Sequence, residues 1–348
     1  MLFFIRLWKS VTGFNFLSIA LASVLVVLVG TVGIHLIERD NFPSLFDGFW
    51  WTMTTVTTVG YGDFYPETIP GRLLGIFLFL FGIGVIGVLI GKIVDGASAY
   101  KHMQREGKLV IKKKGHYIYI GWSKKVKRSI EEVLASEKNA FIVVVDDTKE
   151  HPFDHEQVAF VQGDPSDEAT LIHANLLEAA RVAVFSDPEL ESTLLADAKT
   201  LLIASAVEGL SKKENTNIHT VVEINNETHI PKFEHISIDD FILSNDSVSL
   251  LMAKAVMAPG TSNLFRQLLS KQYGTNIYEI QPDSIWKTYQ DAQEELTKEG
   301  IVLLCINQDM NYLKERETSL RTEDRLYIIA SDEAYEKISR SIVQYPFT

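Results

Sequence analysis

Two long stretches without charged side chains constrain this chain more than any other feature of its sequence. Between Lys9 and Glu38 the only ionisable residue is His35. Residues 14–34 are enough to cross about 30 Å of hydrocarbon as a helix. A second stretch, residues 73–91, is close to the length that a span needs. A signal peptide would be shorter and would end at a small-residue cleavage site, so we expect two membrane-spanning helices.

Basic residues gather on one side of the two predicted spans. They precede the first span and follow the second, at Arg6, Lys9, Lys92, Lys101, Arg105, Lys108, Lys112, Lys113 and Lys114. The loop between the spans is acidic, with Arg39 and Arg72 against Glu38, Asp40, Asp47, Asp63 and Glu67. Because Lys and Arg stay on the cytoplasmic side of a membrane, we expect both termini in the cytoplasm and the chain in the plasma membrane.

The loop between the spans contains a helix-like run and then a run of small residues. Pro43 and Ser44 open the first run, residues 45–56, since proline fits a first helical turn. The second run is Thr57-Thr58-Val59-Gly60-Tyr61-Gly62-Asp63. Alternating small residues and glycines let successive carbonyls turn toward one axis, where four strands can replace the water shell of a cation. Non-helical backbone at membrane depth is tolerated where it lines such a watery path.

The second run resembles the selectivity filter of potassium channels, of which the sequence TVGYG is the established example. The resemblance implies that K⁺ is bound by a filter of Thr58, Val59, Gly60, Tyr61, Gly62 and Asp63. It also implies an aromatic cuff around the filter from Trp50, Trp51 and Tyr61, although an interfacial aromatic belt has the same composition. Some relatives have a glutamate where this chain has Thr54. The alternative is a surface turn in which the five residues occur by chance.

The second span contains Gly82-Ile83-Gly84-Val85-Ile86-Gly87, which matches a dinucleotide-binding pattern letter for letter. That pattern requires a preceding strand and a βαβ unit, whereas this copy lies inside a hydrophobic span. Glycine in a membrane helix allows close helix packing or a bend. The resemblance makes Gly82 the gating hinge, and we expect Gly84, Gly87 and Gly91 to pack or to line the pore.

Charge separates the membrane part from the remainder of the chain. Residues 1–115 carry 11 Lys and Arg against 7 Asp and Glu, whereas the whole chain has a net charge of −12. The remainder is therefore strongly acidic, which argues against nucleic-acid binding. Cys305 is the only cysteine, which excludes a disulfide framework and a CxxC site. His219 and His229 are expected at the surface rather than on a metal.

After a polar and basic stretch, residues 97–115, short apolar runs alternate with segments of helical period. The predicted strands are residues 117–120, 141–145, 158–161, 181–185 and 220–222. The predicted helices are residues 125–136, 167–175 and 189–206. This alternation predicts a parallel sheet with helices on both faces, which is a Rossmann-like α/β domain.

The dinucleotide site of this domain is incomplete in the sequence. The first strand is followed by Gly121-Trp122-Ser123-Lys124-Lys125-Val126, which keeps one glycine of three. Asp146 follows the second strand, where an acidic residue either holds a ribose hydroxyl or caps the next segment. Gly121 and Asp146 are therefore candidate nucleotide-binding residues. The sequence shows no constellation of catalytic acid, base and nucleophile, so we do not expect an enzyme.

In this order the parts resemble the two-helix prokaryotic potassium channels with a fused RCK (TrkA-N and TrkA-C) domain, a family that includes calcium-gated archaeal channels. Besides the filter, the resemblance rests on Ile120-Gly121-Trp122-Ser123 and Val161-Gln162-Gly163-Asp164-Pro165. It implies a membrane α pore at residues 1–96, a linker at 97–115, an RCK N-terminal domain at 116–244, crossover helices at 245–272 and a small α+β C-terminal lobe at 273–348.

The resemblance also implies the partners of this chain. Such channels are tetramers in which cytoplasmic domains pair into a ring, and ligand binding to the ring opens the gate. Residues 247–257 with Ala258-Pro259-Gly260 would be the crossover helix of the pair, for which an ordinary surface helix is the alternative. An internal start at Met103 would supply separate soluble copies of the domain. Glu323-Asp324-Arg325, before residues 326–329, marks the C-terminal lobe, as do residues 301–306.

The sequence leaves the gating ligand open. Calcium-gated relatives supply carboxylates at positions that correspond to Ser186, Glu223 and Asn225, and Asp187 is next to the first. Calcium prefers several oxygen ligands with net negative charge, and this set has lost a carboxylate. Nearby replacements are Glu189, Glu191 and Glu227. Asp187, Glu223 and Asn225 are thus candidate ligands of Ca²⁺; Glu223 could also join its strand to a neighbour, and a nucleotide or small anion is the other ligand class.

The sequence as a whole predicts a potassium-selective channel gated by a ligand at a cytoplasmic ring. A membrane-anchored NAD-linked redox sensor is one alternative, which the incomplete glycine turn disfavours. A subunit of a potassium-uptake transporter is the other. Such proteins usually carry several pore repeats or a separate regulatory chain.

Overall fold

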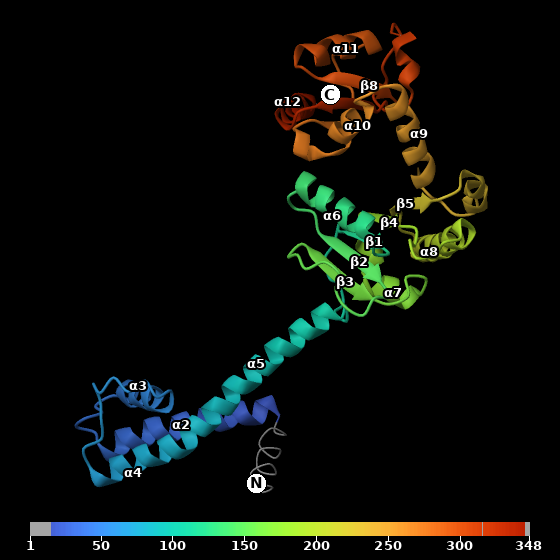
Figure 1. Cartoon of the computed structure of the whole chain (residues 1–348). Coiled ribbons are helices and arrows are strands. Elements are labelled where there is room, and N and C mark those ends of the chain that lie inside the picture. The colour runs from blue at the N-terminus through green and yellow to red at the C-terminus, as the bar shows by residue number, and fades with distance from the viewer. Residues whose placement is uncertain (1–14, 315, 345–348) are drawn as a thin grey trace. The chain divides into compact units, whose positions relative to one another are not determined.

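The computed structural model describes residues 15–314 and 316–344 (Figure 1). Arg6, Lys9 and residue 14, on which the predicted orientation and the start of the first span depend, lie outside the described residues. The chain divides into two compact units, residues 1–103 and 104–348, and each is described by itself. The finer domain boundaries stay predictions.

Two of the described helices are long and apolar enough to cross a membrane. The first is α2, Phe16–Ile37. The second is continuous over Ile69–Arg105, as α4 (Ile69–Phe77), a π-helical turn η1 (Leu78–Gly82) and α5 (Ile83–Arg105). It continues into the stretch expected as a linker, where the sequence has no proline. Gly107, with a φ of 63°, follows its end in the left-handed conformation that suits glycine.

The short helix α3, Leu45–Val56, packs closely against α2. A Cβ atom at Gly30 would lie 2.6 Å from Cγ2 of Thr52, and one at Gly48 would lie 2.7 Å from the carbonyl oxygen of Thr31. Small residues are what allow helices in a membrane to approach this closely. The core of the unit is formed by Ile34, Phe42, Trp51, Val56 and Leu78. This core fixes α3 against both long helices.

Glu38, directly after α2, ties the end of that helix to the start of α4. Its carboxylate accepts hydrogen bonds from the backbone N–H groups of Glu67 (3.0 Å) and Thr68 (2.8 Å), the Thr68 hydroxyl (2.6 Å) and the Asn41 amide (3.3 Å). Burial alone would raise the pKa of Glu38, but these hydrogen bonds outweigh it and hold the pKa below its ordinary value of 4.5. The loop that contains residues 57–63 is therefore closed at its base.

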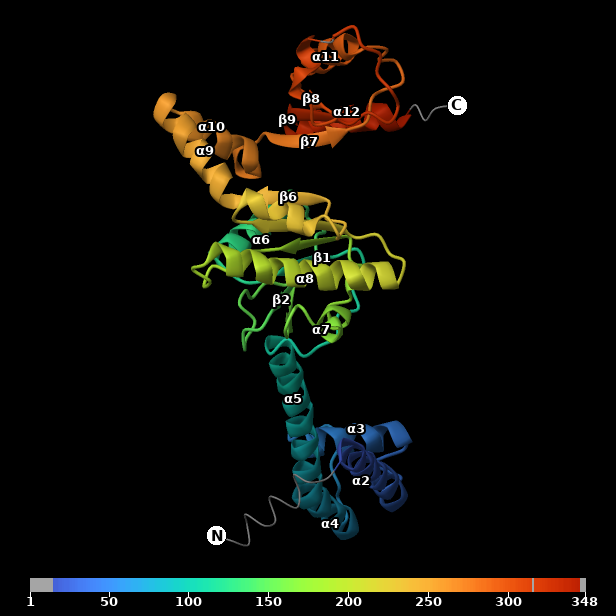
Figure 2. The same ribbon diagram turned by 90° about the vertical axis from the view of Figure 1, so that its right-hand side faces the viewer.

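The second unit is built on a six-stranded parallel sheet, which confirms the predicted Rossmann-like fold (Figure 2). The strand order is β3-β2-β1-β4-β5-β6. The strands are β1 (Tyr117–Ile120), β2 (Ile142–Asp146), β3 (Val158–Gln162), β4 (Arg181–Val184), β5 (His219–Ile224) and β6 (Asp240–Leu243). The sequence does not predict β6, because this short strand is only partly buried and begins at an aspartate pair.

Helices cover both faces of this sheet (Figure 2). On one face α6, Lys124–Ser136, packs through Val126 and Ile130. On the other, α7 (Glu168–His173) and α8 (Thr193–Lys213) pack around a larger core. The helix α8 begins later than predicted, after its cap at Ser192, and it continues to Lys213.

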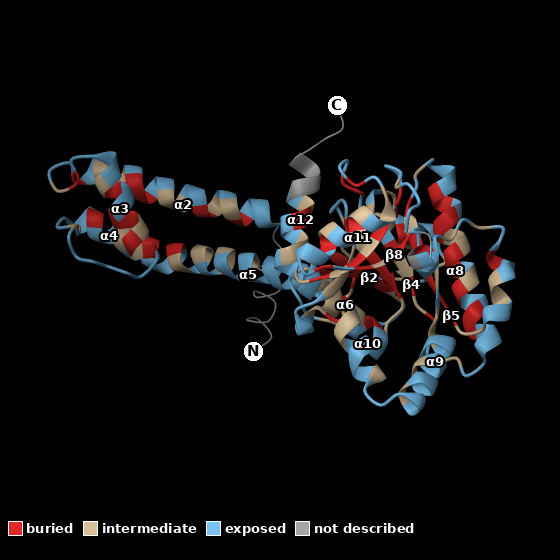
Figure 3. Cartoon of the chain, turned by 90° about the horizontal axis from the view of Figure 1, so that it is seen from above, coloured by how far each residue is buried: buried red, intermediate tan, exposed pale blue. Residues whose placement is uncertain are grey.

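After β6 the chain forms two exposed helices and a small lobe. Over their whole described length, α9 (Ser244–Met257) and α10 (Thr261–Leu269) contain no buried residue (Figure 3). The lobe has an antiparallel sheet in the order β7-β9-β8. The helix α11 contacts β8, and α12 contacts β7 and β9. Its elements are β7 (Asn276–Ile280), α11 (Tyr289–Lys298), β8 (Val302–Ile306), β9 (Leu326–Ala330) and α12 (Asp332–Gln344). Short 3₁₀ turns are η2 (Leu176–Glu178), η3 (Glu227–Phe233), η4 (Lys271–Tyr273) and η5 (Met310–Lys314).

Glu38→Gln removes the charge from the clamp between α2 and α4 and keeps the side-chain shape. We expect a loss of about 2 kcal/mol in unfolding free energy at neutral pH, because hydrogen bonds to a charged group contribute about 1.5–3 kcal/mol. Since folding lowers the pKa of Glu38, its contribution is present above pH 4.5 and is lost as the pH falls below that value. Thermal unfolding of both proteins against pH measures this loss, and equal pH dependence in the two would contradict it.

Candidate functional site

The run from Thr58 to Gly62 has an alternating backbone. Thr58, Gly60 and Gly62 lie in the left-handed region, with φ of 62°, 55° and 76°, and they alternate with Val59 and Tyr61. Glycine adopts this conformation freely, whereas a β-branched residue such as Thr58 does so at a cost of about 1–3 kcal/mol. Strain of this kind persists where the surroundings enforce it and is typical of ligand-binding sites.

The helix α3 leads directly into this run. Its start is fixed by a capping box, in which the Asp47 N–H donates to the Ser44 hydroxyl (3.2 Å) and the Ser44 N–H donates to the Asp47 carboxylate (3.1 Å). The sequence suggested that Pro43 lies in the first helical turn. In the structure Pro43 instead precedes the cap residue Ser44. At the other end, the Gly60 N–H donates to the Thr54 carbonyl at 3.1 Å, which joins the run to the helix. The C-terminal end of a helix favours a cation.

The two tryptophans predicted as a cuff take different positions. The Trp50 indole N–H donates to the Asp63 carboxylate at 2.7 Å, and its ring stacks on Tyr61 with centroids 5.7 Å apart. Trp51 is buried instead, with its ring 5.5 Å from that of Phe42. Within this chain, Trp50 is the tryptophan that supports the run, and Trp51 belongs to the core between the helices.

Thr54 occupies the place where some relatives have a glutamate. Its hydroxyl donates to the Trp51 carbonyl at 3.0 Å and is buried. Asp63 accepts hydrogen bonds from Trp50 and from the Phe64 N–H, the latter at 3.1 Å. The Asp63 carboxylate is thus held by two donors. The Thr54 hydroxyl bonds within α3, to the Trp51 carbonyl.

Gly82, the predicted hinge, ends the π-helical turn η1 and packs against the end of α3. A Cβ atom at Gly82 would lie 2.6 Å from Cγ1 of Val56, closer than real contacts allow. By contrast, apart from the adjacent residues and the helix's own backbone, no described atom lies within 4 Å of a Cβ built at Gly84, Gly87 or Gly91. Close packing therefore requires a glycine at position 82 within this chain, and its role as a hinge stays a prediction.

In the second unit, a cleft of about 370 Å³ opens at the carboxyl ends of β1 and β4, where the strand order reverses. This switch point is the usual ligand site of such sheets. The candidates Gly121 and Asp146 both line it. The Asp146 carboxylate accepts from the Thr148 N–H at 2.9 Å, so it also caps the loop after β2.

Carboxylates dominate the charge of this cleft. Its acidic lining residues are Asp146, Asp147, Asp164, Asp187 and Glu189, and Lys199 is its basic one. Burial alone would lower the pKa of Lys199, but its ion pair with Asp187 (2.7 Å) outweighs that effect and raises the pKa. An acidic cleft with one glycine in its first turn is poorly suited to a pyrophosphate group.

Each of the three candidate calcium ligands is already bonded to another group of the chain. Glu223 accepts from the Lys125 ammonium and from the Ser186 N–H (3.1 Å), while Asp187 pairs with Lys199. Asn225 donates its side-chain amide to the Ser186 hydroxyl at 2.6 Å. Among the described residues, no group of three or more His, Cys, Asp or Glu side chains could hold a metal ion.

Asp197 organises this region, and the sequence did not single it out. It is 2% exposed on α8 and accepts from the N–H groups of Asn225 (2.9 Å) and Asn226 (3.2 Å). It also pairs with His229 at 2.7 Å, and the His229 side chain, expected at the surface, is 20% exposed. The sequence signal that could have identified Asp197 is its position as an acidic residue among the apolar residues of α8.

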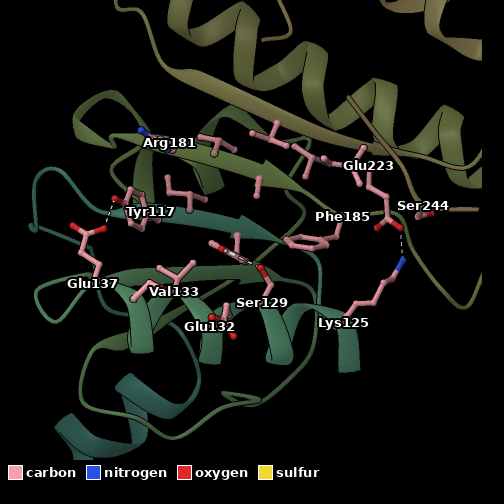
Figure 4. A pocket seen from close by; sticks show the side chains of 18 residues that line it. Tyr117, Lys125, Ser129, Glu132, Val133, Glu137, Arg181, Phe185, Glu223 and Ser244 are labelled. Carbon is pink, nitrogen blue, oxygen red and sulfur yellow. Dashed lines mark hydrogen bonds and ion pairs between the residues drawn. The ribbon is translucent and has the colours of Figure 1, made fainter. Parts of the chain in front are cut away.

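A second, apolar cavity of about 580 Å³ lies on the α6 face of the sheet (Figure 4). Figure 4 shows it between α6 and the strands, with Val133 and Phe185 at its wall and Lys125 reaching Glu223 at one end. At the other end the Tyr117 hydroxyl donates to Glu137 at 2.7 Å. Its wall is therefore mostly apolar, with a bonded pair of polar side chains at each end.

Two known protein families match this chain, one in each unit. The family described as Ion channel matches residues 21–98, and the TrkA-N domain family matches residues 117–244. YugO of Bacillus subtilis, named as a potassium channel protein, is 31% identical over 228 residues, which cover 66% of this chain and 68% of YugO. This chain belongs to the prokaryotic potassium channels that carry a TrkA-N domain.

Two further relatives extend the comparison of this channel. TvoK of Thermoplasma volcanium, named as a calcium-gated potassium channel, is 28% identical over 327 residues, which cover 90% of this chain and 91% of TvoK. The solved structure of the GsuK channel bound to NAD is 15% identical with a TM-score of 0.44, and the match covers 91% of this chain and 57% of GsuK. The GsuK structure bound to ADP has a TM-score of 0.43 at 16% identity.

Membership in this family confirms the recognised resemblance and favours a gated potassium channel over the redox sensor and the uptake-transporter subunit. The relatives are channels rather than enzymes. With its two apolar helices, the chain is a membrane protein.

Gly82→Ala in this channel would press a methyl group into Val56 at the end of α3. Overpacking of this kind costs about 1–3 kcal/mol, so we expect a lower melting temperature of the assembled channel. Val56→Ala in the same chain removes the opposing methyl and should restore most of the loss. Thermal unfolding of the wild type, both single variants and the double variant measures it.

If the double variant stays as unstable as Gly82→Ala, the contact with Val56 is not the reason for the glycine. The open probability of the same proteins tests the hinge separately. A hinge role predicts that opening is impaired in Gly82→Ala and remains impaired in the double variant.

Proposed function

We propose that four copies of this chain surround one pore, whose selectivity filter is Thr58, Val59, Gly60, Tyr61, Gly62 and Asp63. The alternating left-handed residues support this, because such a backbone turns successive carbonyls to one side. The exposure of Val59 (53%) and Tyr61 (68%) also supports it, because side chains at membrane depth need cover that further subunits would supply. K⁺ would exchange its water shell for carbonyl oxygens and the Thr58 hydroxyl.

The proposed pore has both chain termini in the cytoplasm. The acidic loop between the spans and the basic residues after Gly91 support this orientation. Gly84, Gly87 and Gly91 would line the pore or meet other subunits, which fits the open space around them in one chain.

Cytoplasmic domains of the channel would pair through α9 and α10. Both helices expose large apolar side chains, namely Val248, Leu250, Met252, Val256, Met257, Leu264, Phe265 and Leu269. Apolar surface of this kind on a folded domain is typical of an interface. The apolar cavity beside α6 would give a second copy a further surface to contact.

Separate soluble copies of the domain would begin at Met103. This residue is the last of the first compact unit, so a chain that starts there keeps the whole second unit. Met103→Leu should remove a fragment of the mass of residues 103–348 from preparations of the expressed channel, without changing the full-length band. Mass spectrometry of the purified channel tests it, and a fragment that persists in Met103→Leu would contradict an internal start.

Ligand binding to the cytoplasmic domain would open the gate, and the cleft with Gly121 and Asp146 is the proposed binding site. Calcium gating in TvoK, which aligns over most of this chain, supports regulation through this domain. The position of the cleft at the switch point of the sheet supports the site. Its acidic lining favours a ligand with hydroxyl or cationic groups over one that binds through phosphates.

The observation that carries the proposal is the alternating backbone of the filter, and single-channel recording tests it. Purified channel in a planar bilayer, with unequal K⁺ and Na⁺ on the two sides, should give currents that reverse near the potassium potential. Gly60→Ala, at a residue with a φ of 55°, should abolish selective current but leave the oligomer intact on native gels. Non-selective or absent current from assembled wild-type protein would refute the proposal.

A further inference from the structure

The acidic residues that the calcium resemblance singles out already have cationic partners from the same chain. Glu223 pairs with Lys125 of α6, and Asp187 pairs with Lys199 of α8 at 2.7 Å. In each case the lysine comes from a helix packed on the sheet. Glu223 lies near the end of β5, and Asp187 follows β4. A lysine side chain of the same chain therefore supplies the positive charge that a metal ion would bring.

Glu223 is the better defined of the two sites. Its side chain is 6% exposed, and its two oxygens have different partners: Oε1 accepts from the Lys125 ammonium and Oε2 accepts from the Ser186 N–H at 3.1 Å. Figure 4 shows the lysine extending from the start of α6 to the end of β5. A buried carboxylate needs such a counter-charge, since an unpaired charge is costly to bury.

The neighbouring positions do not add ligands for a divalent ion. Ser186 supplies a hydroxyl in place of a carboxylate, and that hydroxyl lies 2.6 Å from the Asn225 amide nitrogen. The same amide nitrogen is 3.0 Å from Oδ1 of Asp197. A carboxylate only accepts hydrogen bonds, so the Asn225 side chain must present its NH₂ group there, and not its oxygen.

The residues present therefore do not fit calcium. Ca²⁺ takes about 6–8 oxygen ligands. Here both oxygens of Glu223 are already bonded, to the Lys125 ammonium and the Ser186 N–H, and Asn225 presents an amide donor. The disagreement is chemical: Lys125 and the Asn225 NH₂ group repel the ion that the resemblance implies.

We propose that the ammonium of Lys125 is a tethered cation that permanently fills the divalent-ion position at Glu223, so that this channel is not regulated by calcium at that site. The inference rests on the proposed role of the cytoplasmic domain in gating. It concerns binding, however, and binding is measurable without any current.

The experiment measures thermal unfolding of the full-length channel in detergent against CaCl₂, with ionic strength held constant by NaCl. The proteins are the wild type, Lys125→Met, Glu223→Gln and the double variant. The lysine side chain is 51% exposed, so methionine removes the charge without emptying the core. Lys124→Met, one residue earlier on α6, is the matched control, because it changes the net charge equally and is not the partner of Glu223.

The wild type and Lys124→Met should show no saturable rise of the melting temperature with calcium. Lys125→Met should melt below Lys124→Met without calcium, because it leaves a buried carboxylate unpaired, and calcium should then raise its melting temperature. In the double variant, where the carboxylate is gone as well, the apparent calcium affinity should be at least about tenfold weaker than in Lys125→Met, a difference of about 1.4 kcal/mol.

Two results would overturn the proposal. One is a saturable calcium response of the wild type that Glu223→Gln abolishes, because calcium would then bind where Lys125 is said to be. The other is a calcium response of Lys125→Met equal to that of Lys124→Met, because removal of the lysine would then open no cation position. Neither result tests the proposed pore. If the pore proposal were wrong, the current would be non-selective while the calcium responses stayed as expected here.

Discussion

The backbone of residues 57–63 leaves the helical form within the loop between two membrane helices, and the first unit is organised around that constraint. Backbone polar groups at membrane depth must be paired or face a watery path. Hydrogen bonds join the run to α3 at the Gly60 N–H and to Trp50 at the Asp63 carboxylate. A capping box fixes the start of α3, the helix that leads into the run. The contact of Gly82 with Val56 and the clamp of Glu38 then fix α3 and the loop against the long helices.

The same requirement for partners, applied to buried charge, organises part of the second unit. Asp197 is satisfied by two backbone N–H groups and by His229, and Glu223 by Lys125 and the Ser186 N–H. Both networks lie at the carboxyl ends of β4 and β5, beside the cleft at the switch point. The Asn245 amide donates to the Asn225 carbonyl at 3.3 Å, so the Asp197 network also reaches α9. A ligand in the cleft would thus act on residues connected to the exposed helices.

The filter at residues 58–63 stays a prediction from a glycine motif. The two apolar helices and the parallel sheet were predictable because each depends on a local pattern, namely apolar length or the alternation of short runs. Three features were not predictable, because they depend on which helices face each other. They are the π-helical turn, the close contact of Gly82 with Val56, and the different positions of Trp50 and Trp51. The pairs Lys125–Glu223 and Asp197–His229 join residues 98 and 32 positions apart. Neither pair has a sequence signature, and a resemblance to calcium-gated relatives points away from the first.

The central claim, that carbonyls of residues 58–62 bind dehydrated cations, is tested most directly by anomalous X-ray scattering from crystals of the full channel grown in Tl⁺, a heavy substitute for K⁺. The account predicts a column of anomalous peaks on the four-fold axis, level with the carbonyls from Thr58 to Gly62. An assembled tetramer with well-ordered residues 58–62 and no anomalous peak on that axis would contradict it.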